Sequence, residues 1–118
     1  MSTLAFQWSV YSVDLDPVIG SEQAGRRPVI IISREVANIS LPVVTVIPLT
    51  RRKPDRRVYP NEALVPEGTA GLTHDSVAMA HQLRTLSKQR LGTHVGRIDE
   101  QTIRTEIQHA IRTHLDLD

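Results

Sequence analysis

The segment PVIGSEQAGRRPVIIIS, residues 17–33, decides the fold because it joins a polar, glycine-containing loop to a run of β-branched residues. Its second part, PVIIIS at residues 28–33, is too short for an independent helix and is apolar at successive positions. This pattern is typical of a strand that is buried on both faces. A strand of this kind needs partners, so we expect a sheet to be built around it.

Further β-prone segments lie on both sides of this strand. Residues 8–15 (WSVYSVDL) end at an Asp-Pro turn signal, and residues 41–50 (LPVVTVIPLT) form a second apolar run. Prolines near both ends of the second run predict an edge strand or a bulge, because proline cannot donate to a central ladder. Two more strands are expected at residues 57–60 and at residues 75–86.

The C-terminal segment predicts an amphipathic helix. Asp99 is a favourable N-cap, Glu100 falls in the first turn, and an apolar residue then recurs at every fourth position. We expect this stripe to pack on the sheet and the polar side, which includes Arg104, to face water. Before it, Ser87 is expected to cap a single helical turn that ends at Gly92. The stripe consists of Ile103, Ile107, Ile111 and Leu115, with Ala110 beside it.

Length and composition restrict the class of protein. A chain of 118 residues that is 40% hydrophobic fits one compact domain, residues 1–118, with short strands followed by one helix. This order predicts a mainly β fold with α: a small curled sheet or partly open barrel with a C-terminal helix packed against it. The absence of cysteine excludes disulfides and thiolate chemistry. No signal peptide or membrane span is evident, so we expect a soluble, cytoplasmic protein without membrane contact.

Positive charge is concentrated in the middle of the chain. Residues 51–98 carry nine basic and four acidic side chains, a net charge of +5, whereas the whole chain carries +1. Most of the excess lies in RRKPDRR, residues 51–57, and such a segment favours contact with phosphate oxygens. The alternative is a solvated hairpin loop. The aromatic share of 3% argues against a stacking platform for bases.

Metal and serine-hydrolase chemistry find little support in the sequence. None of the five histidines pairs with another at the i, i+4 spacing that would place two ligands on one helical face, and no Gly-x-Ser-x-Gly segment occurs. We therefore predict no metal site. The histidines are His74, His81, His94, His109 and His114.

The loop before the decisive strand has the features of an anion site. Arg27 precedes a proline, which favours extended backbone and fixes the origin of a side chain suited to phosphate. Two glycines in the loop permit a tight backbone that brings Glu22 and Gln23 close to it. The alternative is that Arg26 and Arg27 are ordinary surface charges and that Glu22 pairs with one of them.

Several motifs in order resemble the MazF/PemK family, the endoribonuclease toxins of type II toxin-antitoxin systems. The motifs are VYSVDLDPVIGSEQAGRRPVIIIS, LPVVTVIPLT, HDSV, QLRTLSKQRL and the final helix, and they extend from about Val10 to Leu115. The resemblance implies a small SH3-like barrel with a C-terminal helix that forms homodimers. It also implies cleavage of single-stranded RNA, often messenger RNA, without a metal or other cofactor.

The resemblance also assigns roles to individual residues. Arg27 matches the catalytic arginine of the family, and Thr50 matches the threonine that ends the strand motif. Cleavage by the neighbouring 2′-hydroxyl leaves a 2′,3′-cyclic or 3′-phosphate and a 5′-hydroxyl, and it needs a base, a charge stabiliser and a proton donor. Arg27 would bind the phosphorane and protonate the leaving oxygen, and Thr50 would hydrogen-bond a non-bridging oxygen. His81 stands where many members carry an acidic residue, either as the general base or as a hydrogen-bonded strand histidine.

The last expectations concern a partner protein and two alternative functions of the chain. The family resemblance implies a cognate antitoxin whose flexible, acidic tail lies across the toxin dimer. The first strand departs from the family at Gln7, Trp8 and Ser9. Two other functions remain open: a CcdB-like gyrase-poisoning toxin without enzymatic activity, and a degenerate module that only binds the antitoxin. The residues expected to bind or border RNA are Glu22, Gln23, Arg26, Arg51, Arg52, Arg56 and Arg57.

Overall fold

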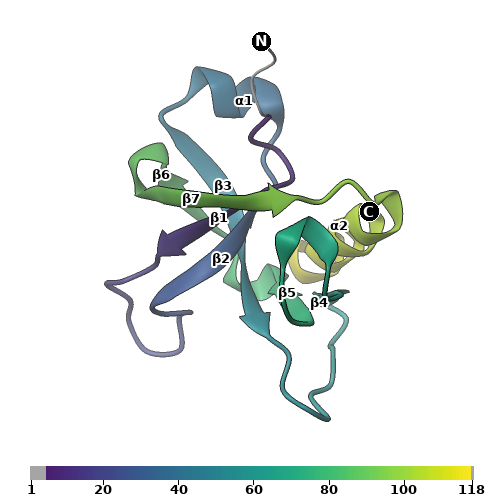
Figure 1. Ribbon diagram of the computed structural model, residues 1–118. Helices are drawn as coiled ribbons and strands as arrows, with labels where there is room; N and C mark the ends of the chain where they lie inside the picture. The colour runs from purple at the N-terminus through teal and green to yellow at the C-terminus, as the bar shows by residue number, and fades with distance from the viewer. Residues whose placement is uncertain (1–4, 118) are drawn as a thin grey trace.

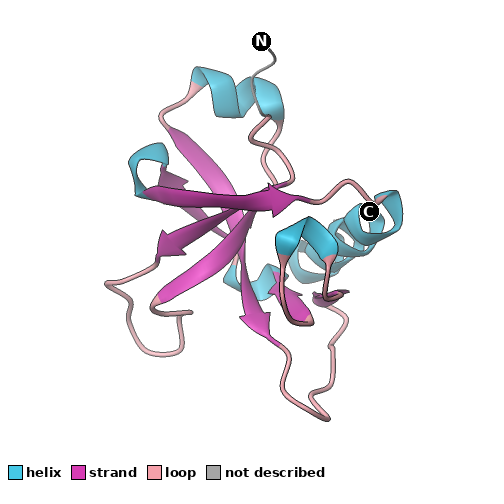
Figure 2. Ribbon diagram, in the orientation of Figure 1, coloured by secondary structure: helices cyan, strands magenta, loops and turns pink. Residues whose placement is uncertain are grey.

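The computed structural model describes residues 5–117 as a curled antiparallel sheet with a C-terminal helix beside it (Figure 1; Figure 2). This arrangement confirms the predicted fold class. The predicted domain also includes residues 1–4 and 118, which lie outside the described residues. The strands are β1 (Ser9–Asp14), β2 (Arg26–Ile31), β3 (Val43–Arg51), β4 (Glu62–Val65), β5 (Ser76–Met79), β6 (Arg84–Ser87) and β7 (Leu91–Arg97). The helices are α1 (Glu35–Ser40) and α2 (Gln101–Leu115).

The long strand β3 lies at the centre of the sheet. The strand order is β4-β5-β3-β2-β1-β7, and β6 also pairs with β3. One edge of β3 pairs with β2, and the other pairs with β6 over residues 43–46 and with β5 over residues 49–51. Of the two predicted alternatives, the edge position is therefore wrong, and the ladder on one edge of this central strand is interrupted instead. Pro48 is tolerated because it falls in the break between β6 and β5, where that edge of β3 has no paired residue.

Successive residues of the central strands pack into two cores on opposite faces of the sheet. One core contains Ile30 and Ile47 together with Ile107 of α2, and the other contains Val29 and Ile31. Side chains alternate between the faces of a strand, so a run of apolar residues fills both cores at once. The strand predicted from PVIIIS is thus buried on both faces, as expected.

The helix α2 covers one core, but the predicted stripe is too long. Ile107 and Ala110 are buried, and Ile103 and Ile111 pack at the margin of the same core. Leu115 is 48% exposed, so its predicted packing on the sheet is wrong. It is the last residue of α2, and the core ends one turn earlier.

Two polar positions near the start of α2 also differ from the prediction. The N-cap is Glu100 rather than Asp99, whose carboxylate instead accepts a hydrogen bond from Arg97 Nε at 3.1 Å. Arg104 is half-buried instead of facing water, because its Nε donates to the Ile98 carbonyl at 2.7 Å. The guanidinium also lies 5.3 Å from the centre of the Trp8 ring, an arrangement that favours a cation.

The sequence pattern did not predict the remaining helices and strands correctly. Residues 57–60 are a loop rather than a strand, and the strand β4 begins only after them. Residues 75–86 are not one strand as predicted: they contain β5 and most of β6, with a 3₁₀ turn at Ala80–Gln82 between them. Neither α1 nor β7 was predicted. Ser87 caps a 3₁₀ turn as expected, but that turn ends at Arg90 and Gly92 already belongs to β7.

Among residues 5–117, no helix is long and apolar enough to cross a bilayer. The loops at residues 15–25 and 52–61, which contain several of the predicted site residues, leave the same end of the sheet (Figure 1).

Candidate active site

Arg27 and Thr50 meet across two neighbouring strands. Val29 of β2 pairs with Pro48 of β3, and the two strands are antiparallel. Extended by two residues, toward the start of β2 and the end of β3, this register brings Arg27 opposite Thr50. Residues two apart lie on the same face, so both side chains extend on one side of the sheet. Arg27 Nη1 donates to Thr50 Oγ1 at 3.3 Å. The structure therefore brings together the two residues that the resemblance assigned to catalysis.

The loop before β2 holds the guanidinium of Arg27 with neutral partners. Its Nε donates to the Ala24 carbonyl at 2.8 Å. The amide oxygen of Gln23, when it faces the guanidinium, accepts from Nη2 at 2.8 Å and from Nη1 at 2.9 Å. Gly20 and Gly25 have φ values of +59° and +79°, a region that favours glycine and permits the tight turn. The expected approach of Gln23 to Arg27 is thus present.

Gln82 anchors this loop by direct hydrogen bonds to its backbone. Its Oε1 accepts from the Gln23 backbone N–H at 3.0 Å, and its Nε2 donates to the Ser21 carbonyl at 3.3 Å. Gln82 belongs to the 3₁₀ turn after β5, so the loop position is fixed by a segment that is distant in sequence. Sequence reasoning missed this residue, since neither its type nor its spacing signals such a contact.

Glu22 and Arg26 lie apart from the guanidinium of Arg27. Glu22 Oε1 accepts from the Ile19 backbone N–H at 2.6 Å, so this carboxylate stabilises its own turn. Arg26 follows the strand alternation to the opposite face, where its Nη1 lies 3.4 Å from Ser12 Oγ. Neither the close approach of Glu22 to Arg27 nor an ion pair between Glu22 and either arginine is found among the described residues.

The basic segment after β3 crosses the sheet end rather than forming a hairpin. The strand β5 lies between β3 and β4, so residues 52–61 connect two strands that do not pair. Arg51 is exposed, and Arg52 Nε donates to the Arg56 carbonyl at 3.1 Å. Arg57 is also exposed, with its guanidinium 5.3 Å from the centre of the Tyr59 ring. The hairpin alternative is thus wrong, whereas two arginines of this segment, Arg51 and Arg57, do face solvent.

Arg56 differs from its neighbours because it pairs with a buried carboxylate. Its Nη1 and Nη2 donate to Glu62 Oε1 and Oε2 at 3.1 and 2.9 Å, a bidentate pair. The Glu62 side chain is only 2% exposed. The same carboxylate accepts from the Tyr59 backbone N–H at 3.1 Å and bonds His81 Nε2 at 2.9 Å. Sequence reasoning missed Glu62, because its partners come from two other segments of the chain.

The surroundings of Glu62 favour its charged form. Burial alone raises the pKa of this carboxyl, but the hydrogen bonds from the guanidinium, the imidazole and the backbone N–H outweigh burial and lower the pKa to about 2. The carboxylate is therefore ionised at neutral pH and balances the charge of Arg56. For the same reason the pKa of Arg56 is raised, chiefly by its hydrogen bond to Glu62.

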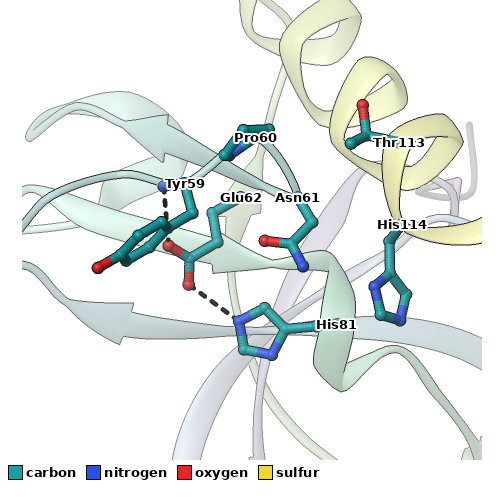
Figure 3. Close-up of a pocket in the computed structure, with 7 residues that line it drawn as sticks. All are labelled: Tyr59, Pro60, Asn61, Glu62, His81, Thr113 and His114. Carbon is teal, nitrogen blue, oxygen red and sulfur yellow. Dashed lines mark hydrogen bonds and ion pairs between the residues drawn. The ribbon is translucent and has the colours of Figure 1, made fainter.

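His81 lies between two surface cavities at this end of the molecule. A cavity of about 630 Å³ is bordered by His81, by the segment that starts β4 and by the last turn of α2 (Figure 3). A second cavity of about 390 Å³ is bordered by His81, Gln82 and the loop residues Ser21 and Glu22. His81 makes no direct hydrogen bond to Arg27 within the described residues; Gln82 and Gln23 connect the two regions.

This arrangement can bind and polarise an anionic ester. Thr50 accepts from Arg27 through its oxygen, so its hydroxyl hydrogen remains able to donate elsewhere. A guanidinium held by neutral partners keeps its positive charge for a ligand, and its planar fork suits phosphate oxygens. The described residues contain no cluster of three or more histidine or acidic side chains arranged to hold a metal ion. The hydrogen-bond donors of Arg27 and Thr50 thus suit the oxygens of a phosphodiester better than they suit a metal ion.

Comparison with known proteins places this chain in a family. The family model described as PemK-like, MazF-like toxin of type II toxin-antitoxin system matches residues 6–115. The chain is 34% identical over 113 residues to Endoribonuclease MazF9 of Mycobacterium tuberculosis, with 92% of this chain and 93% of that protein covered. It is 32% identical over 108 residues to Endoribonuclease EndoA of Bacillus subtilis, with 92% and 91% covered. The chain therefore belongs to the PemK-like, MazF-like toxin family.

Solved structures agree with this assignment. An endoribonuclease in complex with its cognate antitoxin from a mycobacterial species matches with a TM-score of 0.78 and 25% identity, covering 98% of each chain. MazF from Deinococcus radiodurans has the same fold, with a TM-score of 0.79 at 21% identity over 98% of this chain and 100% of that chain. The resemblance seen in the sequence motifs is thus confirmed at the level of family and fold.

Proposed function

We propose that this chain is an endoribonuclease toxin that cleaves single-stranded RNA, chiefly messenger RNA, by 2′-hydroxyl transesterification. The observation that carries this proposal is the Arg27–Thr50 pair at one end of the sheet, with Arg27 held by neutral partners. The curated relatives named endoribonucleases support the activity. The proposed substrate implies action in the cytoplasm, where messenger RNA is translated.

The proposed reaction divides the chemistry among three side chains. His81 takes the proton from the 2′-hydroxyl, whose oxygen attacks the neighbouring phosphorus and forms a bond to it. Arg27 and Thr50 bind the non-bridging oxygens, where negative charge increases in the phosphorane. The bond from phosphorus to the 5′-oxygen then breaks, and that oxygen takes a proton from Arg27, which regains a proton from solvent. The products are a 2′,3′-cyclic phosphate, which can open to a 3′-phosphate, and a 5′-hydroxyl.

The basic segment after β3 supplies the proposed contact with the RNA chain. Arg51, Arg52 and Arg57 present positive charge beside the end of β3 and attract phosphates regardless of base sequence. Arg56 is already neutralised by Glu62, so we assign it to support of the loop instead of direct RNA contact.

We also propose control by a partner protein. Family membership associates the chain with a type II toxin-antitoxin system, and a solved relative is described as a complex with its cognate antitoxin. The finer expectation is an antitoxin with a flexible, acidic tail that lies across a toxin homodimer and covers the basic segment. Opposite charge would guide the encounter and would be weakened by salt.

The decisive experiment measures product ends. Purified protein is mixed with a long RNA of mixed sequence in the presence of a chelator, and the 5′-hydroxyl ends are sequenced. We expect cleavage at a limited set of sites and its near loss in Arg27→Ala. A second substrate carries one 2′-deoxy sugar at a preferred site and should survive.

Three results would contradict the proposal in different ways. Cleavage of the 2′-deoxy substrate would exclude attack by the neighbouring hydroxyl. Intact RNA together with gyrase trapped on DNA would identify the CcdB-like alternative. Intact RNA and normal growth of cells that express the chain without a partner would identify a module that only binds an antitoxin.

A further inference from the structure

A carboxylate is buried behind His81 and has no part in binding the phosphate. Glu62 lies at the start of β4, and its side chain is 2% exposed. Its two oxygens accept two donors from Arg56 and one from the Tyr59 backbone N–H. Figure 3 shows that the remaining direction, toward His81, is closed by the imidazole.

The donors around Glu62 keep its carboxylate ionised, and an ionised carboxylate determines which nitrogen of His81 carries the proton. An ionised carboxylate can only accept hydrogen bonds, and arginine and backbone N–H groups can only donate them. Since Glu62 Oε2 lies 2.9 Å from His81 Nε2, the imidazole must donate at Nε2. The neutral ring then has its free electron pair on Nδ1. In Figure 3 this second nitrogen points away from Glu62.

The position of His81 makes this free nitrogen useful. The imidazole borders the cavity formed with Ser21, Glu22 and Gln82, which belong to the loop that holds Arg27 or to its anchor. Within residues 5–117, the only hydrogen-bond partner of the His81 ring is Glu62. A substrate hydroxyl that bonds Nδ1 therefore breaks no hydrogen bond between this nitrogen and the described part of the protein.

We propose that Glu62 is a positioning residue that fixes His81 in the Nε2–H form, so that Nδ1 accepts the proton of the attacking 2′-hydroxyl. This inference rests on the proposed RNA cleavage. Arg56 completes the device, because its bidentate bond fixes the plane of the carboxylate that orients the ring. When His81 becomes charged during the reaction, the adjacent carboxylate stabilises the imidazolium.

Nuclear magnetic resonance on the wild-type protein gives the first test. Nitrogen-15 chemical shifts of the His81 side chain distinguish the two neutral forms at a pH where the ring is uncharged. We expect the proton on Nε2. A proton on Nδ1 in the folded wild-type protein would overturn the proposal, and this measurement needs no variant.

The second test replaces Glu62 with its neutral isostere. In Glu62→Gln, Arg56 can bond only the amide oxygen, so the amide NH₂ is directed at His81 Nε2. The ring must then accept at Nε2 and carry its proton on Nδ1, the wrong form for a base. We expect this proton shift in the nitrogen-15 spectrum, a decrease in kcat on the order of 10²-fold to 10⁴-fold and little change in KM.

The control for Glu62→Gln is the same substitution at an exposed glutamate. Glu106→Gln makes the same chemical change on the exposed surface of α2 and should leave kcat, KM and the His81 spectrum unchanged. A folded Glu62→Gln protein with wild-type kcat would contradict the role of Glu62 while leaving RNA cleavage intact. A wild-type protein that leaves RNA uncut would instead contradict the proposed function, and its His81 spectrum could still be read.

Discussion

Arg27 and Arg56 are both half-buried arginines at the same end of the sheet, yet their surroundings differ in one respect. Arg27 is held by the oxygens of Gln23, Ala24 and Thr50, all of them neutral. Arg56 is held by the buried carboxylate of Glu62. The partners of Arg27 orient its guanidinium without cancelling its charge, whereas the partner of Arg56 does cancel it.

The difference separates a group available to a ligand from a group committed to the fold. A phosphate that approaches Arg27 displaces no competing anion, and the guanidinium is already oriented. The same phosphate would have to compete with a carboxylate for Arg56, at a large electrostatic cost. Residue type alone therefore does not identify the arginines that bind substrate; the charge of the nearest acceptor does.

The strongest test of this contrast is a pair of matched substitutions. Arg27→Met should lower the cleavage rate on the order of 10²-fold to 10³-fold, because a preoriented charge at the phosphorane is lost, with little change in the free energy of unfolding. Arg56→Met should lower the free energy of unfolding by about 2 kcal/mol, since it leaves Glu62 buried without its main partner. Cleavage assays and urea unfolding measure both effects.

Arg112→Met provides the control for these two variants. Arg112 lies on the exposed side of α2, so both rate and stability should stay at wild-type values. The contrast would be lost if Arg27→Met unfolded the protein as readily as Arg56→Met.

The Glu62 network should also make stability depend on pH. The pKa of Glu62 is about 2 in the folded protein against an ordinary value of 4.5. A lowered pKa adds stability above the ordinary value, and this stability is lost as pH falls through the folded value. The contribution is on the order of 3 kcal/mol at neutral pH, since each pKa unit corresponds to roughly 1.4 kcal/mol. It should disappear between about pH 4.5 and pH 2.

Comparison with Glu62→Gln isolates this contribution. Urea unfolding, followed by fluorescence of the buried Trp8, should show wild type more stable than the variant at pH 7 and a gap that narrows toward pH 2. The exposed variant Glu106→Gln should follow the wild-type curve at every pH. A gap of equal size at pH 7 and near pH 2 would show that Glu62 stabilises the fold by some means other than its ionisation.

The two regions also differ in how well the sequence predicted them. The Arg27 region could be predicted, because it lies in a loop and strand whose proline, glycines and apolar run give local signals. Its pairing with Thr50 follows from the register of adjacent strands. The Glu62 region gave no such signal, since residues 57–60 resembled a strand and the partners of Glu62 are brought together only by the fold.

The missed strand β7 has a similar physical explanation. Its sequence, LGTHVGR, lacks apolar alternation and contains two glycines. At Gly92, an added Cβ would lie 2.5 Å from the Ser12 carbonyl oxygen, so the glycine is needed for close approach to β1. A strand selected for close backbone contact carries few of the apolar residues by which strands are recognised in sequence.

The smallest expected effect concerns the other member of the Arg27 pair. Thr50→Val keeps the shape of the side chain but removes its hydroxyl, while the Gln23 and Ala24 oxygens still hold the guanidinium. We expect a decrease in cleavage rate of about tenfold, or roughly 1.4 kcal/mol, with unchanged stability. Thr45→Val, on the same strand but distant from the pair, serves as the control. A loss as large as that of Arg27→Met would mean that Thr50 is the principal group at the phosphorane, and that the guanidinium depends on it for its orientation.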